Sequence, residues 1–539
     1  MHLSTSVLAV GFALLCLGAF SAFCALRVLA AQMGSSQAGS GRLLLAGCGA
    51  GLLTLGCRLW IAEGHVSWSP YADQWNAEIS GILAPLVHGT LGWRELFAGN
   101  NEHRVVLTRA LSLAVVLVNG GWDNRVLVVA NYLLESLMVA WVCVLAWSAL
   151  GWARGSYVCA AALLPMFLVC DWESLVSSNQ TQFVFMAFGS VLALSLAQGY
   201  SLGSLGSWGA LALALLALGS MASGFLTALA LAATAALVAF AGGRRARSVA
   251  AFWAACLGLA ALGWFTRVQF TALHFLYAKS PADWVQAFLS YAAWPLAPGA
   301  LGFGVLWLPW LILVYRTLRF REARPLAPFA LGLGLWDLLQ SCALAWTRSG
   351  FSGLVSSRYT EFLMWGTVAN AVAMVIVFSG RGRQGGRRAA SLAAMAAWLA
   401  LVGGSEVWRS SRVYQPYFDS FRAQTLGHEQ ILGAFARTGD ASEIEGAAFP
   451  RIPMFSGDGI IATLRDPQVL ALFPAPLRRD FVRDRQPSLL DSERDGPLSF
   501  AALRAEECGP AIALAGAAMV AGALLLARRA AAGLKAAGT

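Results

Sequence analysis

Long apolar stretches alternate with short polar ones along most of the chain. Thirteen stretches are long enough to cross about 30 Å of hydrocarbon at about 1.5 Å per residue. They lie near residues 3–31, 43–62, 126–149, 155–170, 182–198, 206–222, 225–241, 249–265, 299–316, 326–347, 362–379, 389–404 and 510–527. The pattern therefore predicts an all-α polytopic membrane protein with about 13 transmembrane helices.

One further apolar stretch, residues 105–118, is short and contains Arg109. It is entered through Glu102, His103 and Arg104, which is a polar approach for a membrane span. We therefore interpret it as an interfacial or re-entrant helix.

These assignments divide the chain into three parts. Residues 1–404 form a multi-span membrane domain, with a first large extracytoplasmic loop at 63–125 that holds interfacial helices. Residues 405–508 mix acids, arginines and prolines, which predicts a small folded periplasmic cap or lid. Residues 510–539 form the final transmembrane helix and a cytoplasmic tail.

Composition supports the membrane class. Hydrophobic residues make up 58% of the 539 residues and charged residues only 12%, whereas soluble domains carry about 25% charged residues. A surface with so few charges needs lipid to cover it, so membrane lipids are expected partners. Soluble enzymes and nucleic-acid binders are excluded.

The formal net charge is +10, and the charged residues are distributed unequally between the two sides of the membrane. Arginines gather at 244–247, 316–324, 381–388 and, with Lys535, at 528–535, between spans that lie an even number of crossings apart. By the positive-inside rule these clusters face the cytoplasm. The N-terminus is then outside, the C-terminus is cytoplasmic, and most carboxylates lie on the periplasmic side, where we expect the active site.

Asp73 is the first candidate for chemistry. It lies in the first large loop between Tyr71 and Trp75, in a sequence typical of the lipid headgroup level. A carboxylate there could accept a proton from an attacking hydroxyl. The alternative is that Asp73 only caps the amphipathic helix that follows it. Glu78, in the same loop, is a further substrate-binding candidate.

Glu102, His103 and Arg104 form the second cluster of candidates. An acid, an imidazole and a guanidinium follow one another directly after two asparagines. They could line a substrate cavity, with Arg104 on a phosphate, or they could simply hold a helix entry at the interface.

Two later loops supply the remaining candidates. Glu173, Gln180 and Gln182 border the loop after the fourth span, and amide groups suit sugar hydroxyls because they donate and accept. Arg358 and Tyr359 lie at the outer end of a span, against the positive-inside trend. Arg358 therefore needs an anionic partner, either a substrate phosphate or a nearby acid such as Glu361.

Several charged residues fall within or beside predicted spans. Glu135 and Asp337 lie mid-span and are either functional or hydrogen-bonded packing residues. Arg58 is interpreted as snorkelling to the interface. Asp171 is interpreted as a helix cap.

The order of these features resembles the GT-C superfamily of integral-membrane glycosyltransferases. The resemblance is carried by the topology and by Tyr71-Ala72-Asp73-Gln74-Trp75, Asn101 to Arg104, Trp172 to Phe183, and Ser357-Arg358-Tyr359. These segments look like those of uncharacterised bacterial members. The sequence lacks the paired Asp-Glu of protein O-mannosyltransferases and the WWDxG signature of oligosaccharyltransferases.

The resemblance implies an inverting enzyme that moves a sugar from a polyprenyl-phosphate carrier to a glycan, lipid or protein acceptor. Asp73 would then act as base, and Arg358 or Arg104 would hold the carrier phosphate. No metal ligand set is assigned, and the need for a divalent cation stays open. Two alternatives remain: an O-antigen polymerase or ligase, and a non-enzymatic flippase or transporter of lipid-linked glycans.

Overall fold

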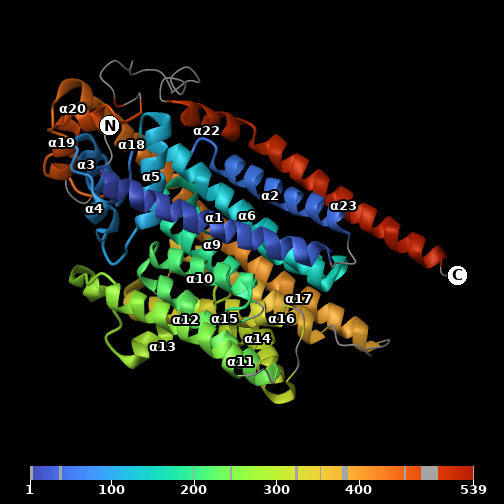
Figure 1. Ribbon diagram of the computed structural model, residues 1–539. Coiled ribbons are helices and arrows are strands. Elements are labelled where there is room, and N and C mark those ends of the chain that lie inside the picture. Colours follow the sequence, from blue (N-terminus) through green and yellow to red (C-terminus); the bar gives the residue numbers. More distant parts are fainter. Residues whose placement is uncertain are drawn as a thin grey trace.

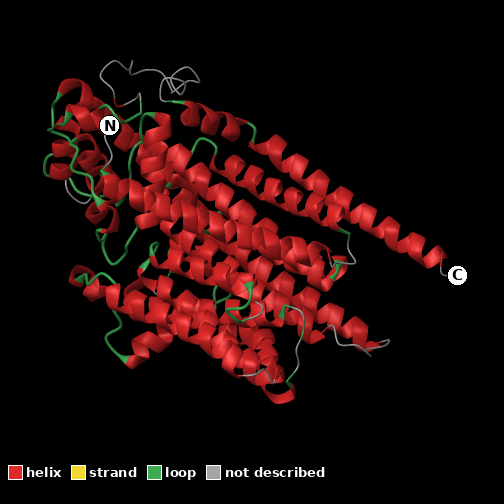
Figure 2. Cartoon of the chain, viewed as in Figure 1, coloured by secondary structure: helices red, strands yellow, loops and turns green. Residues whose placement is uncertain are grey.

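The structure is a computed structural model that describes residues 4–34, 39–197, 200–242, 246–321, 324, 326–351, 354–378, 386–454, 457–474, 477 and 496–537. These residues form helices and connecting loops without a strand (Figures 1 and 2). The expected all-α class is thereby confirmed. Of the arginines used to orient the chain, Arg244, Arg245, Arg381 and Arg383 lie outside the described residues.

Ten helical stretches among the described residues are long and apolar enough to cross a membrane, so the chain is a polytopic membrane protein. The helices concerned are α1 (Thr5–Gly34), α2 (Ser40–Ala62), α6 (Asn124–Leu150), α11 (Phe225–Gly242), α12 (Ala246–Thr266), α14 (Ala300–Phe320), α15 (Ala327–Thr347), α16 (Ser357–Phe378), α17 (Gly386–Arg409) and α23 (Gly509–Ala537). The α17 stretch continues without a break through η8 (Ser410–Tyr414) into α18 (Gln415–Thr438).

Three of the thirteen predicted spans correspond to shorter helices. They are α7 (Trp152–Leu163, 12 residues), α9 (Thr181–Leu196, 16 residues) and α10 (Leu205–Leu218, 14 residues). At about 1.5 Å per residue, such helices cover less than about 30 Å of hydrocarbon. Hydropathy overestimated their length because apolar residues also fill turns, such as Leu168 to Cys170 before Asp171.

The stretch expected to be interfacial is a short helix, α5 (Val106–Asn119, 14 residues). It packs against α6 and against η1 (Trp75–Leu83), a π-helix in the preceding loop. The remaining short elements are α3 (Ala84–Val87), α4 (Trp93–Phe97), η2 (Leu164–Phe167), α8 (Trp172–Val176), η3 (Ser178–Gln180), η5 (Ala222–Gly224), η6 (Thr271–Leu276), α13 (Pro281–Ala292), η7 (Ser349–Phe351), α19 (Gly457–Arg465), α20 (Pro467–Leu470) and α22 (Pro497–Glu507).

Helix α16 is the central helix of the bundle. Its apolar window is 94% buried, and it contacts α7, α9, α14, α15 and α17. Other helices rather than lipid therefore surround α16 on nearly every face. The beginning of α16 therefore offers rigid positions for polar side chains.

The first large loop and the segment after α17 form one body. Trp75 and Trp122 from the loop region pack with Phe473, at ring-centroid distances of 5.9 and 6.3 Å. These rings belong to a hydrophobic cluster separate from the core of the helix bundle. Figure 1 shows α18, α19 and α20 beside the N-terminus, whereas the C-terminus lies at the opposite end. We call the end with α18, α19 and α20 the cap end.

Close backbone approach holds the last helix, α23, against α2. A Cβ atom added to Gly516 would lie 2.7 Å from the Gly49 carbonyl oxygen and would also clash with the Leu53 nitrogen. Helix pairs in membranes associate through small residues of this kind, because lipid supplies no hydrophobic driving force between helices.

The substitution Gly516→Val should therefore destabilise the α2–α23 pair. We expect a loss of about 1–3 kcal/mol, as for other overpacked contacts, measured as a lower Tm of the detergent-solubilised protein. The matched control is Gly522→Val on the same helix, because a Cβ atom there meets nothing within 4 Å. Equal Tm values for the two variants would contradict the close approach.

Candidate functional site

Asp73 lies at the cap end, in a loop fixed to the cap. The Ala72 N–H donates to the Pro453 carbonyl at 2.6 Å, and Ala72 has a positive φ of 49°. The half-buried Asp73 carboxylate accepts a hydrogen bond of 3.2 Å from the Asn101 side-chain amide. Since only one of its oxygens has this partner, the carboxylate keeps capacity to accept a proton.

Glu173, at the start of α8, fixes the first residues of α16. Its Oε2 atom accepts hydrogen bonds from the Ser356 and Ser357 hydroxyls, at 3.0 and 2.6 Å, and from the Arg358 backbone N–H at 3.2 Å. Its Oε1 atom lies 3.3 Å from an Arg358 guanidinium nitrogen. The Arg358 side chain remains 38% exposed, so part of its fork is free to meet an anion.

Asp73, Tyr71 and Glu173 all act electrostatically on Arg358. The structure thus brings together the acid and the arginine that the sequence suggested for one site, although 285 residues separate them in the chain (358 − 73). Burial, followed by the Glu173 charge, raises the pKa of Tyr71, while Arg358 opposes this shift. Tyr71 therefore stays protonated and can donate a hydrogen bond in the site.

Glu102 is held in an ion pair at the edge of this region. Two Arg348 nitrogens donate to its carboxylate, at 2.7 and 3.2 Å, and the Tyr277 hydroxyl donates at 3.2 Å. A carboxylate with three donors has little capacity left for a ligand. This geometry favours a structural role for Glu102 over contact with a substrate.

His103, next to Glu102, is neutral near pH 7. Burial lowers its pKa to about 4; Glu102 opposes the shift, and Arg348 and Arg358 add to it. Its Nδ1 atom accepts from the Ala222 N–H at 3.3 Å. The single ring proton of the neutral imidazole is therefore assigned to Nε2.

Arg104 and Glu78, two further candidates, are engaged elsewhere. Arg104 donates to the carbonyl oxygens of Phe97 and Thr266, at 2.8 and 2.9 Å. Glu78 is fully buried and accepts from Ser112, Trp122 and Ser178 at 2.9–3.0 Å. Burial raises the Glu78 pKa. Both side chains therefore tie protein segments together.

Gln180, Gln182 and Tyr359 are buried, with 5%, 3% and 7% of their surface exposed. The side-chain carbonyl oxygens of both glutamines have no hydrogen-bond partner among the described residues. Buried acceptors of this kind need a donor. The Tyr359 ring lies 6.1 Å from Phe183 and 6.2 Å from Tyr291, which packs it into the bundle.

An apolar cavity of about 1580 Å³ lies beside the segment that holds Glu102 and His103. Its lining comes from α1, α2, α4, α5, α6, α9 and α10. Leu96 and Leu107, on either side of residues 102 and 103, belong to this lining. The lining is almost entirely apolar, so the cavity suits apolar rather than polar groups.

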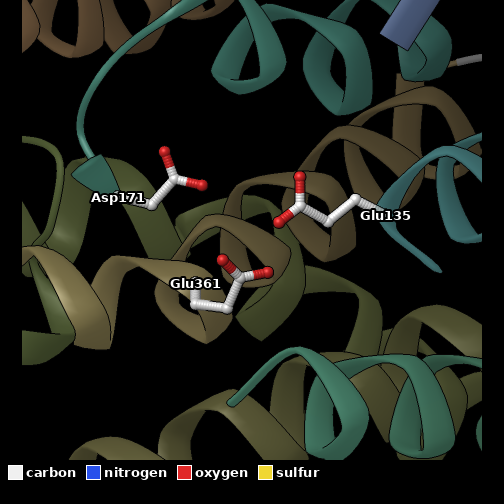
Figure 3. Close-up of side chains that lie close together, drawn as sticks. All are labelled: Glu135, Asp171 and Glu361. Carbon is white, nitrogen blue, oxygen red and sulfur yellow. The ribbon is translucent and has the colours of Figure 1, made fainter. Parts of the chain in front are cut away.

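Sequence reasoning missed a second group of charges beneath the candidate site. Arg58 is fully buried and bound to Glu135 and Asp171, so the interpretation that it snorkels to the interface is wrong. Glu361 lies beside them, and Figure 3 shows the three carboxylates turned toward one another. The available signal was the charge of Arg58 and Glu135 inside apolar stretches, but sequence gives no pairing between distant positions.

The fold and the site define a polytopic membrane protein with acids, arginines and a tyrosine gathered at the cap end of its helix bundle. Comparison of the sequence with protein-family models and with curated proteins found no match. A function must therefore be argued from the site itself.

The hydrogen bonds of Glu173 predict that the substitution Glu173→Gln will loosen the start of α16. Gln keeps the shape but loses the charge that holds Arg358 and two serines, so we expect a loss of about 1–3 kcal/mol, seen as a lower Tm in detergent. The exposed Glu443 supplies the control variant Glu443→Gln. An unchanged Tm for Glu173→Gln would show that Glu173 does not fix this end of the helix.

Proposed function

We propose that the protein is a glycosyltransferase of the bacterial inner membrane, with its active site on the periplasmic side. It would move a sugar from a polyprenyl-phosphate carrier to a hydroxyl of a glycan, lipid or protein acceptor. The observation that carries the proposal is the position of Asp73, whose carboxylate acts on the partly exposed Arg358 guanidinium. A general base thus shares one site with an anion-binding group.

Each group has a step to perform. Asp73 accepts the proton of the acceptor hydroxyl as its oxygen attacks the anomeric carbon. The bond between that carbon and the carrier phosphate breaks, and the configuration at the carbon inverts. Arg358 stabilises the negative charge that develops on the departing phosphate. Tyr71, protonated and close to Arg358, is placed to donate to a sugar or phosphate oxygen.

The apolar cavity supports a lipid-linked donor. Its lining residues are almost all apolar and include Leu15, Leu52, Leu137 and Phe188 along the bundle. A carrier chain in this cavity would contribute about 0.8 kcal/mol per buried CH₂ group. The adjacent segment 96–107 would then lead from the chain to the polar site. The side-chain oxygens of Gln180 and Gln182, which have no hydrogen-bond partner in the described part of the chain, would accept from sugar hydroxyls.

The substitution Asp73→Asn should abolish transfer and leave the protein folded. Asn keeps an oxygen to accept from Asn101 but cannot take the proton, so we expect a fall in kcat of about 10²–10⁴-fold. The measurement is release of lipid phosphate from a panel of labelled polyprenyl-phosphate sugars in membranes. The exposed Asp458 gives the control variant Asp458→Asn. Full activity of Asp73→Asn would refute the assignment of the base.

The substitution Arg358→Lys separates the proposed enzyme from a polymerase or ligase. Lys keeps the charge but loses the planar fork, so we expect kcat/KM for the lipid-linked donor to fall about 10²-fold. In the proposed transferase, Asp73→Asn and Arg358→Lys both impair turnover. Loss of activity in the Arg358 variant alone would favour the polymerase or ligase. Transport of a lipid-linked glycan in proteoliposomes without sugar transfer would favour the flippase.

A further inference from the structure

Four ionisable side chains meet in the interior of the bundle, below the candidate site. They are Arg58 on α2, Glu135 on α6, Asp171 in the turn before α8, and Glu361 on α16, and each is at most 1% exposed. One oxygen from each carboxylate lies within 4.8 Å of the other two (Figure 3). The four side chains come from four separate parts of the sequence, so the fold itself creates the cluster.

Arg58 forms ion pairs with only two of the three carboxylates. Its Nε atom lies 2.8 Å from Glu135 Oε2, and its two terminal nitrogens donate to the two Asp171 oxygens at 3.0 and 2.5 Å. Glu361 remains, with neither of its oxygens hydrogen-bonded among the described residues. Three carboxylates and one guanidinium give a formal charge of −2 (−3 + 1). A buried site of this charge needs protons or cations.

The side chain of Ser174 also lies at this carboxylate cluster. The Ser174 side chain is fully buried and faces Glu361. Its hydroxyl oxygen has no partner with hydrogen-bond geometry among the described residues. Buried hydroxyls are normally paired. The Ser174 hydroxyl and the Glu361 carboxylate thus interact with each other without good hydrogen-bond geometry to any described residue, which leaves oxygen lone pairs for a cation.

We propose that Glu135, Asp171 and Glu361, together with the Ser174 hydroxyl, bind one divalent cation of the Mg²⁺, Ca²⁺ and Mn²⁺ class. These ions prefer oxygen ligands. With bonds of about 2.0–2.6 Å, two ligands of one ion lie up to about 4–5 Å apart, and the observed separation meets this limit. One such ion cancels the formal charge of −2, while Arg58 continues to hold Asp171 and Glu135 from the other side.

The cation would stabilise the segments that hold the candidate site in place. It would join α6 and α16 to Asp171, in the turn before α8, and to Ser174 on α8, and Glu173 lies between these two residues. Glu173 in turn holds Arg358. The inference does not depend on glycosyl transfer, because it rests on the buried charges alone.

The test is cation binding by the full-length protein in detergent. The protein is stripped with EDTA and dialysed against Ca²⁺, Mg²⁺ or Mn²⁺, and bound metal is counted by elemental mass spectrometry together with the Tm. We expect one cation per chain and a higher Tm than in EDTA. The substitution Glu361→Gln should abolish both effects. The control is Asp337→Asn, since Asp337 is a buried acid on α15 outside this cluster.

Two results would overturn the proposal. One is a folded, EDTA-treated protein that binds none of the three cations at millimolar concentration. The other is equal binding by Glu361→Gln and the unmodified chain. If Glu361→Gln does not fold, Ser174→Ala provides the test, with an expected loss of affinity of roughly 10-fold. If the original chain binds no cation and Glu361→Gln is more stable than it in EDTA, protonated carboxyls neutralise the cluster in place of a metal ion.

Discussion

The contact between Arg58 and the carboxylates of Glu135 and Asp171 is the constraint on which the site depends. All three side chains are buried, and removing one member of such a group costs about 3–5 kcal/mol because a charge is left without a partner. The contact fixes α2 and α6 to the turn before α8. That turn leads directly to Glu173, so a charge pair inside the bundle determines where an acid at the cap end stands.

Helix α16 connects this interior cluster to the candidate site. Arg358 and Glu361 are three residues apart, which is less than one helical turn. Arg358 reaches the partly exposed side, whereas Glu361 faces the buried carboxylates. Because other helices surround α16 on nearly every face, neither side chain can move far without disturbing the core. The arrangement pre-organises Arg358 for an anionic ligand.

The cap end fixes Asp73, the other candidate residue of the site. Aromatic packing of Trp75 and Trp122 on Phe473 joins the first large loop to residues after α18. The backbone bond from Ala72 to Pro453 and the amide of Asn101 then set the position of Asp73. Segments far apart in the chain thus hold the proposed base opposite Arg358.

The sequence alone determined the membrane class and the long helices, because hydropathy is a local property that needs no knowledge of partners. It also singled out Asp73 and Arg358, each from its own neighbourhood. Only the tertiary structure decided that α7, α9 and α10 are short and that Arg104 and Glu78 have protein partners. It alone showed that Arg58, Glu135, Asp171 and Glu361 meet. A buried charge is tolerated only through partners that helix packing brings from distant positions, and that information is absent from any single stretch of sequence.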